Sequence, residues 1–302
     1  FQIFFLIRKI KPTIIHLISL KPVIFGGFVA LISPINSMVI SITGLGSMFL
    51  KKGIFYKIRE NIFNLFYRII FLFPNLKVIL QNRSDLNYLI KNAKLKKNKT
   101  EIIRGSGVDL KSLKFSEIPK REPIIVMASR IIADKGIFEY IKSIQYLKKH
   151  NFEGKFYLVG DIDYKNPSAI KKSTVNYWHK KKIITYVKHQ KKISTFLKKS
   201  TIIVLPSYRE GFPKILMEAA ACGRPVITTN VPGCKDAIIK NVTGILVPPK
   251  NHILLAKAIK NLCDNRKRLE TIGKAARKHA LKNFDINNVV SQHLYIYKSL
   301  QD

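Results

Sequence analysis

Short apolar runs alternate with helix-like segments through the second half of the chain, and this alternation constrains the fold most. The expected order is strand 124–128, helix 137–148, strands 155–159 and 183–187, helix 193–198, strand 202–205, helix 215–221 and strand 225–228. Strands covered on both faces read as near-continuous apolar runs. A strand–helix–strand order favours parallel sheets with right-handed crossovers. This half is therefore predicted to be an α/β unit.

The first half of the 302 residues follows the same pattern with fewer elements. Strands are predicted at 13–18, 38–42 and 77–81, a helix at 62–73, a second helix from Ser84 or Asp85, and a polar, basic connector at 91–100. Ser and Asp are common helix N-caps. Two α/β units joined near 105–119 are the simplest arrangement.

Residues 22–50 carry no charged side chain, and this length exceeds what a bilayer core requires. One interpretation is a transmembrane helix. The other is a set of buried strands and helices, because Gly26, Gly27, Pro34 and Gly44 break the segment into short runs. The α/β alternation around the segment favours buried elements.

The chain is strongly basic: 54 Lys and Arg against 18 Asp and Glu give a formal net charge of +36. Such an excess favours a polyanionic partner, which can be a nucleic acid, an anionic lipid or a phosphorylated substrate. A chain rich in Ile, Lys, Asn and Phe is also what an AT-rich genome encodes. Apolar residues make up 47% of the chain, and this fraction excludes a disordered protein. The cysteines Cys222, Cys234 and Cys263 have no metal-ligand spacing, which indicates a reduced compartment.

The segment 206–219 carries the most chemical information. It follows a predicted strand and opens a helix, and it holds two carboxylates, Glu210 and Glu218, eight positions apart. Eight helical residues rise by about 12 Å, which is too far for a retaining-hydrolase carboxylate pair and suits the two ends of an elongated ligand. A capping Glu and a solvated helix Glu would give the same spacing.

A second group of polar residues follows the first strand of the second unit. Ser129 and Arg130 lie at its carboxyl end, and Lys135 and Gly136 precede the next helix. Arg binds a diphosphate in bidentate fashion and Lys acts as a point charge. Surface charge is the alternative interpretation of the same pair.

In these motifs the chain resembles the retaining glycosyltransferases of family four, the glycosyl transferases group 1. The resemblance rests on Glu210 and Glu218 with Gly211-Phe212-Pro213 between them, and on five further blocks. These blocks are residues 128–136, 158–160, 221–227, 231–234 and 243–248. The resemblance implies an α/β chain of the GT-B fold, with parallel sheets in two facing Rossmann-like domains.

The resemblance also implies roles for individual residues. Arg130 and Lys135 would hold the diphosphate of a nucleotide-sugar donor, with Ser129 beside them, and are expected to be catalytic together with Glu210. Glu218 would accept hydrogen bonds from the ribose. The donor sugar would be held by Glu210 and the backbone of Gly211, Phe212, Pro213 and Lys214. No Asp-x-Asp motif is present, so we expect a UDP-sugar to bind without cofactor or metal.

The N-terminal half resembles a branch that builds bacterial surface polysaccharides on lipid carriers, through Lys21-Pro22, Gly26-Gly27 and Thr43-Gly44. Lys21, Thr43 and Gly44 are candidates for the acceptor side. Several positions depart from the family: Ile18 and Thr43 stand where relatives have His, Lys188 where Gly is usual, Lys191 and Lys192 where acidic residues are frequent, and Asp236 where Glu is usual. The acceptor contacts and the base-side pocket are affected most.

The implied domain division has three parts: a partial N-terminal acceptor-side domain at 1–108, a nucleotide-sugar-binding domain at 109–285, and a helix at 286–302 that crosses back. The first strands and the glycine-containing loop of the family's N-terminal domain are absent from the sequence, which begins at Phe1. We therefore expect a truncated N-terminus.

The predicted function is retaining transfer of a hexosyl or N-acetylhexosaminyl group to a polyprenyl-diphosphate-linked or polysaccharide acceptor, in lipopolysaccharide, capsule or glycan synthesis. We expect a cytoplasmic enzyme, peripheral on the anionic inner face of the plasma membrane. Alternatives are an inactive truncated remnant that still binds nucleotide-sugar, or a basic membrane- or nucleic-acid-binding protein. No aromatic-interleaved basic face or nucleic-acid module is recognisable, so nucleic acid is not an expected partner.

One segment of the first half bears on the membrane. Phe63, Phe66, Tyr67, Ile70 and Phe71 recur at helical spacing near Lys51, Lys52, Lys57, Arg59 and Arg68. Such a helix lies in a membrane interface or turns its apolar side to a core.

Overall fold

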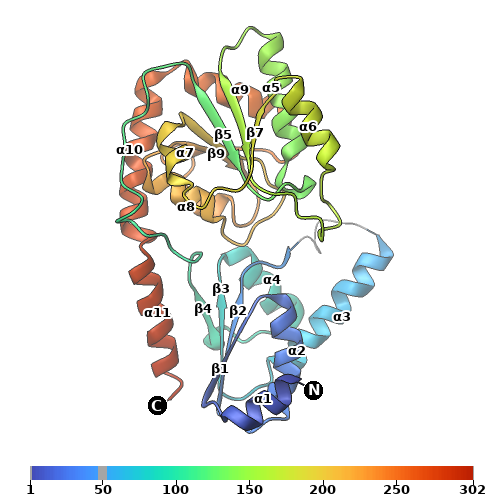
Figure 1. Cartoon of the computed structure of the whole chain (residues 1–302). Helices are drawn as coiled ribbons and strands as arrows, with labels where there is room; N and C mark the ends of the chain where they lie inside the picture. Colours follow the sequence, from blue (N-terminus) through green and yellow to red (C-terminus); the bar gives the residue numbers. More distant parts are fainter. Residues whose placement is uncertain (1, 47–52, 302) are drawn as a thin grey trace. The chain divides into compact units, whose positions relative to one another are not determined.

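The computed structural model describes residues 2–46 and 53–301 (Figure 1). They form two compact units. Unit 1 comprises the described residues up to Ser106 and again from Asn287, and unit 2 comprises Gly107–Ile286. Each unit contains a parallel sheet with its own hydrophobic core, as the α/β alternation predicted.

Unit 2 contains a six-stranded sheet in the order β10-β9-β8-β5-β6-β7. In chain order the strands are β5 (Ile124–Ala128), β6 (Lys155–Val159), β7 (Thr185–Val187), β8 (Ile202–Leu205), β9 (Val226–Thr229) and β10 (Gly244–Val247). Its helices are α5 (Ile137–Lys149), α6 (Lys172–Lys180), α7 (Ser194–Lys199), α8 (Lys214–Ala221), α9 (His252–Cys263) and α10 (Arg266–Asn283). Helix α5 packs against α9, and α8 packs against α10. Because β5 and β8 are parallel neighbours, the segments that follow them leave the sheet at one edge.

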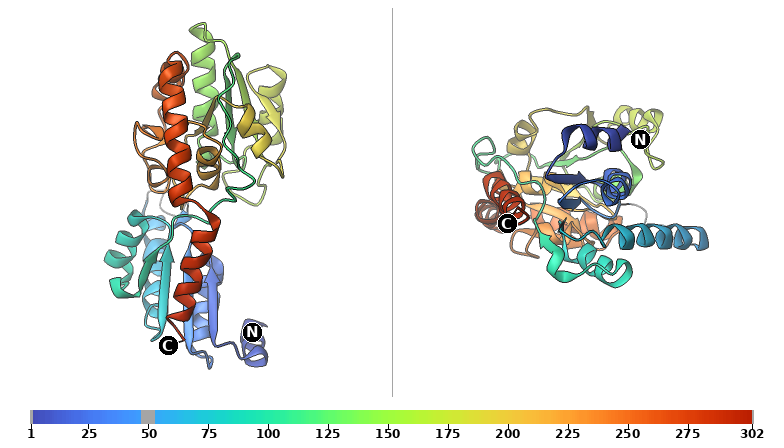
Figure 2. Two further views of the ribbon diagram at one scale, coloured as in Figure 1. Left: turned by 90° about the vertical axis from the view of Figure 1, so that its left-hand side faces the viewer. Right: turned by 90° about the horizontal axis from the view of Figure 1, so that it is seen from below.

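Unit 1 contains a four-stranded parallel sheet in the order β1-β2-β3-β4. The strands are β1 (Ile14–Ile18), β2 (Ser37–Ile42), β3 (Leu76–Leu80) and β4 (Thr100–Ile102). The helices are α1 (Gln2–Ile10), α2 (Leu20–Leu31), α3 (Ile54–Ile70), α4 (Arg83–Ala93) and α11 (Ile286–Lys298). Helix α11, red in Figure 2, follows α10 and packs Val289 and Ile296 against Val39 and Ile79 of the sheet.

The uncharged segment 22–50 contains most of α2 and all of β2, and its last four residues lie outside the described ranges. The interpretation as buried α/β elements therefore holds for the described part. Within residues 2–46 and 53–301, no helix combines the length and the apolar character that crossing a membrane would require.

The structure corrects several predicted boundaries in unit 1. Helix α3 begins at Ile54 rather than at 62. The sequence pattern did not indicate its first turns, because their apolar residues lie on a face that the core does not cover. Helix α4 is capped by Asn82, whose Oδ1 accepts from the Asp85 N–H at 2.8 Å, instead of by Ser84 or Asp85. The predicted connector 91–100 contains the end of α4 and the start of β4, a strand too short and polar to show in the apolar pattern.

Candidate functional site

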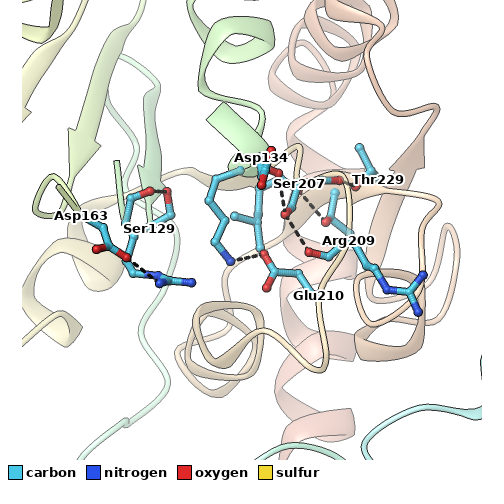
Figure 3. Close-up of polar contacts among 11 residues, drawn as sticks. Ser129, Asp134, Asp163, Ser207, Arg209, Glu210 and Thr229 are labelled. Carbon is cyan, nitrogen blue, oxygen red and sulfur yellow. Dashed lines mark hydrogen bonds and ion pairs between the residues drawn. The ribbon is translucent and has the colours of Figure 1, made fainter. Parts of the chain in front are cut away.

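The loops that follow β5 and β8 are joined by backbone contacts. The Tyr208 N–H and the Ser207 hydroxyl both donate to the Asp134 carbonyl, at 2.9 and 3.2 Å. Gly136 has φ +76°, and a Cβ at this position would lie 2.0 Å from the Pro206 carbonyl oxygen. The close approach of the Pro206 carbonyl to the backbone at position 136 therefore requires glycine there. Together these contacts hold the two motifs of the sequence against each other (Figure 3).

The central feature of this edge is an ion pair between the two loops. Lys135 Nζ lies 2.5 Å from Glu210 Oε1, and the two side chains are only 16% and 11% exposed. The Glu210 N–H donates to the Pro232 carbonyl at 3.1 Å, which fixes the backbone of the same residue. A pair this shielded from solvent is far less screened than a surface pair. Lys135 and Glu210 therefore act as a unit.

Arg130 is paired within unit 2, which the sequence did not indicate. Its guanidinium lies 2.8 Å from Asp163, in the loop after β6. The arginine side chain is 60% exposed, and an ion pair with one partner so open to solvent adds little stability, so displacing Asp163 with another anion would cost little. Figure 3 shows Ser129 and Asp163 on one side of the edge and Ser207, Arg209 and Glu210 on the other.

A cleft of about 560 Å³ opens at the carboxyl ends of the strands of unit 2. Open parallel sheets bind ligands at this position. Its polar side chains come from the segments after three strands and from one helix: Ser129 and Arg130 after β5, Asp161 after β6, His189, Gln190 and Lys191 after β7, and Lys214 and Glu218 on α8. Val159, Ile193 and Ile215 supply apolar surface. Three cations in a cleft with an apolar wall suit a ligand that joins an anion to a ring.

Glu218 is the more buried carboxylate of this cleft. Burial raises its pKa above the ordinary value, and Lys214, at 3.9 Å, partly offsets the rise. A carboxyl group whose folded-state pKa is raised stabilises the fold below its unfolded-state pKa. That stability is lost as the pH rises through the folded-state pKa.

We therefore expect Glu218→Gln to raise the melting temperature relative to the parent chain at pH 8 and to change it little at pH 4. The amide has no charged form to desolvate. Thermal unfolding followed across this pH range measures the difference. A difference that does not grow with pH would contradict this account of Glu218.

The other residues of the predicted donor loop, 211–214, differ in how far they are buried. The Phe212 side chain is buried and packs edge-on against Phe284 at 5.7 Å, so only its backbone is available to a ligand. Pro213 is the N-cap of α8, which begins at Lys214. Gly211 is half-buried, and Lys214 is exposed at the start of the helix.

Tyr208 joins the Glu210 loop to its surroundings through two contacts that the sequence did not indicate. The Tyr208 hydroxyl donates to Glu139 Oε1 at 2.7 Å, and the Lys250 ammonium lies 5.1 Å from the centre of the Tyr208 ring. The hydrogen bond attaches the Glu210 loop to the first turn of α5, just after Lys135, and the Lys250 contact attaches it to the segment between β10 and α9. Tyr208 stands two positions before Glu210, but no local pattern joins it to Glu139 or Lys250.

The candidate acceptor residues lie in unit 1. Lys21 is exposed in the first turn of α2, just after β1, and Thr43 and Gly44 follow β2. Since β1 and β2 are parallel neighbours, these residues leave the sheet at the same edge. His16 lies within β1, where its ring nitrogens are 2.7 Å from the Tyr297 hydroxyl and from Ser41 Oγ. Burial, with a contribution from His293, lowers the pKa of His16 to about 4, which favours the neutral imidazole at pH 7.

Across the part of the chain that the structure describes, no three His, Cys, Asp or Glu side chains gather as a metal site would require.

Residues 108–279 match the family model described as glycosyl transferases group 1. The chain belongs to this family. It is 29% identical over 269 residues to the N,N'-diacetylbacillosaminyl-diphospho-undecaprenol alpha-1,3-N-acetylgalactosaminyltransferase of Campylobacter jejuni, covering 85% of this chain and 69% of that protein. It is also 29% identical to the capsular polysaccharide biosynthesis glycosyltransferase CapM of Staphylococcus aureus, over 57% of this chain and 44% of CapM.

A solved structure shares the fold. Anabaena HepE in complex with UDP superposes with a TM-score of 0.81 at 17% identity, over 98% of this chain and 82% of HepE. The prediction of a GT-B glycosyltransferase fold with parallel sheets is confirmed. The similarity to surface-polysaccharide and lipid-linked glycosyltransferases, expected from the N-terminal motifs, is confirmed as well.

Proposed function

We propose that this chain transfers a hexosyl or N-acetylhexosaminyl group from a nucleotide-diphosphate sugar to a lipid-linked or polysaccharide acceptor, with retention of anomeric configuration. The observation that carries the proposal is the cleft of unit 2. The cleft is lined by three cations and by Glu218, and the Lys135–Glu210 pair lies on the loops that follow β5 and β8 of the same sheet. The similarity to an undecaprenol-linked N-acetylgalactosaminyltransferase supports the acceptor and sugar classes, and the UDP bound by HepE supports uridine as the base.

In this proposal Arg130 exchanges Asp163 for the donor diphosphate, and Lys135 adds a second positive charge. Negative charge grows on the departing nucleoside diphosphate, so these cations stabilise the transition state more than the ground state. Lysine and arginine would thereby do what a divalent ion does in other transferases, and we propose that no metal is required. Glu218 accepts from the ribose hydroxyls, while Glu210 and the backbone of residues 211–214 hold the sugar.

A polyprenyl-diphosphate acceptor is anchored in a bilayer, and its diphosphate lies at the headgroup level. We therefore propose that the protein works in the cytoplasm, at the inner face of the plasma membrane, in lipopolysaccharide, capsule or related glycan synthesis.

The test is turnover of UDP-N-acetylgalactosamine and UDP-glucose in EDTA, with a short-chain lipid-diphosphate sugar as acceptor and NMR of the new glycosidic bond. The proposal expects an α-linked product from an α-linked donor, without added metal. A β-linked product would contradict retention, and turnover that appears only with Mg²⁺ would contradict the role given to the cations. If neither donor is hydrolysed or used for transfer, and UDP does not bind, the proposed function is wrong.

A further inference from the structure

Helix α3 carries an exposed apolar face in addition to the face that packs in unit 1. The residues of the exposed face recur at helical spacing, are 46–84% exposed and are here called the outer stripe: Ile54, Phe55, Ile58, Ile62 and Leu65. The five aromatic and apolar residues that the sequence suggested as a membrane-facing side lie on the opposite, inner face of α3. Tyr67, Ile70 and Phe71 are buried, and Phe63 and Phe66 pack against the same core. That face is core, whereas the outer stripe has no apolar partner among the described residues of unit 1.

The outer stripe is bordered by cations on both sides. At 100° per residue, Lys57 and Arg68 lie along one border and Arg59 along the other, and all three are exposed. Glu60, the single acidic residue of α3, lies on the inner side, where it accepts from the Tyr88 hydroxyl at 2.5 Å. The arrangement is an apolar band between positive rims, in a half of the chain where residues 1–106 hold 17 Lys and Arg but 3 Asp and Glu.

We propose that the outer stripe of α3 inserts into the interface of an anionic lipid bilayer. Such a surface supplies the apolar layer for the stripe and negative headgroups for its rims. A second copy of the chain fits poorly, because two stripes placed face to face would bring together like charges from chains of net charge +36 each. The inference deepens the proposed function, since it locates the attachment needed to reach a lipid-linked acceptor.

The experiment is co-sedimentation of the full chain with vesicles of phosphatidylcholine, with and without 40% phosphatidylglycerol (about this fraction gives a strongly negative surface). The chain should bind the anionic vesicles and leave the neutral ones largely in solution. Ile58→Glu combined with Ile62→Glu should lower the anionic-vesicle partition coefficient by about tenfold or more, because two charges replace the inserted side chains.

A matched control lies on α11 of the same unit. Val290 and Leu294 are 50% and 52% exposed and have the same i, i+4 spacing as Ile58 and Ile62, which are 54% and 46% exposed. Val290→Glu combined with Leu294→Glu adds the same charge, so any loss of binding through net charge alone appears in both variants. The α11 variant should keep vesicle binding within about twofold of the parent.

UDP titration and thermal unfolding accompany each variant. Both are expected to be unchanged, because the substituted residues are exposed and belong to unit 1. Loss of vesicle binding in the α3 variant alone, with UDP affinity retained, supports the proposal. Equal binding by the parent and the α3 variant, equal loss in both variants, or no vesicle binding by the parent would overturn it. A dimer that the α3 variant dissociates would also overturn it. The UDP titration reports separately on the proposed donor site.

Discussion

Glu210→Gln is expected to lower kcat by about 100-fold or more while changing donor affinity much less. Two physical reasons support this expectation. The amide removes the negative charge that pairs with Lys135 at 2.5 Å and leaves at most a neutral hydrogen bond to the ammonium. It also removes a carboxylate from the proposed sugar end of the site, where positive charge would develop on the anomeric carbon. Steady-state kinetics with varied donor gives kcat and KM separately.

Glu218→Gln is the matched comparison, because it makes the same chemical change eight residues away on α8. Its side chain lines the cleft at the proposed ribose end, so the donor KM should rise while kcat changes little. Identical kinetic signatures for the two variants would contradict the division of roles between Glu210 and Glu218.

Gly136→Ala is expected to destabilise the protein by about 3 kcal/mol, because a Cβ would have to displace a backbone carbonyl instead of a flexible side chain. The built Cβ lies 2.0 Å from the Pro206 oxygen, and φ is +76°. The displaced segment is the loop that carries Glu210, so turnover should fall along with stability. Denaturant unfolding measures the free-energy change, and kinetics below the transition measures the loss of activity.

Gly46→Ala separates the clash from the backbone strain. Gly46 has a similar φ of +71°, but a Cβ there meets no described atom within 4 Å. This variant should cost about 1 kcal/mol, the strain of a left-handed non-glycine residue alone. Equal destabilisation by the two substitutions would mean that the contact between the loops after β5 and β8 contributes nothing.

The sequence predicted the sheet of unit 2 well because its central strands are short, apolar and covered on both faces. β5, β6 and β8 have the bounds that the apolar runs indicated. The same reasoning placed Arg130 and Glu210 after strands, so that neighbouring strands brought their loops together. The interaction partners were not predictable, because Lys135 and Glu210 are 75 positions apart and Arg130 and Asp163 are 33 apart. Contacts over such separations leave no periodic signal in one sequence.

Unit 1 was predicted less well, for a different physical reason. Periodicity reports which residues are apolar but does not say which apolar face is covered. In α3 two apolar faces share one helix, so the inner face at Tyr67 and Ile70 was recognised while the outer stripe and the start at Ile54 were not. β4 was missed because Thr100-Glu101-Ile102 has a single apolar residue and depends on pairing with β3.

In the proposed function, lysine and arginine side chains of unit 2 hold a nucleotide diphosphate without a metal ion. Isothermal titration of UDP in EDTA, into the parent chain, Arg130→Ala and Lys135→Ala, measures this binding. We expect metal-independent binding to the parent and at least about tenfold weaker binding to each variant, because each variant loses one partner of a charge contact. Unchanged affinity in both variants, or binding by the parent that appears only when Mg²⁺ is restored, would contradict it.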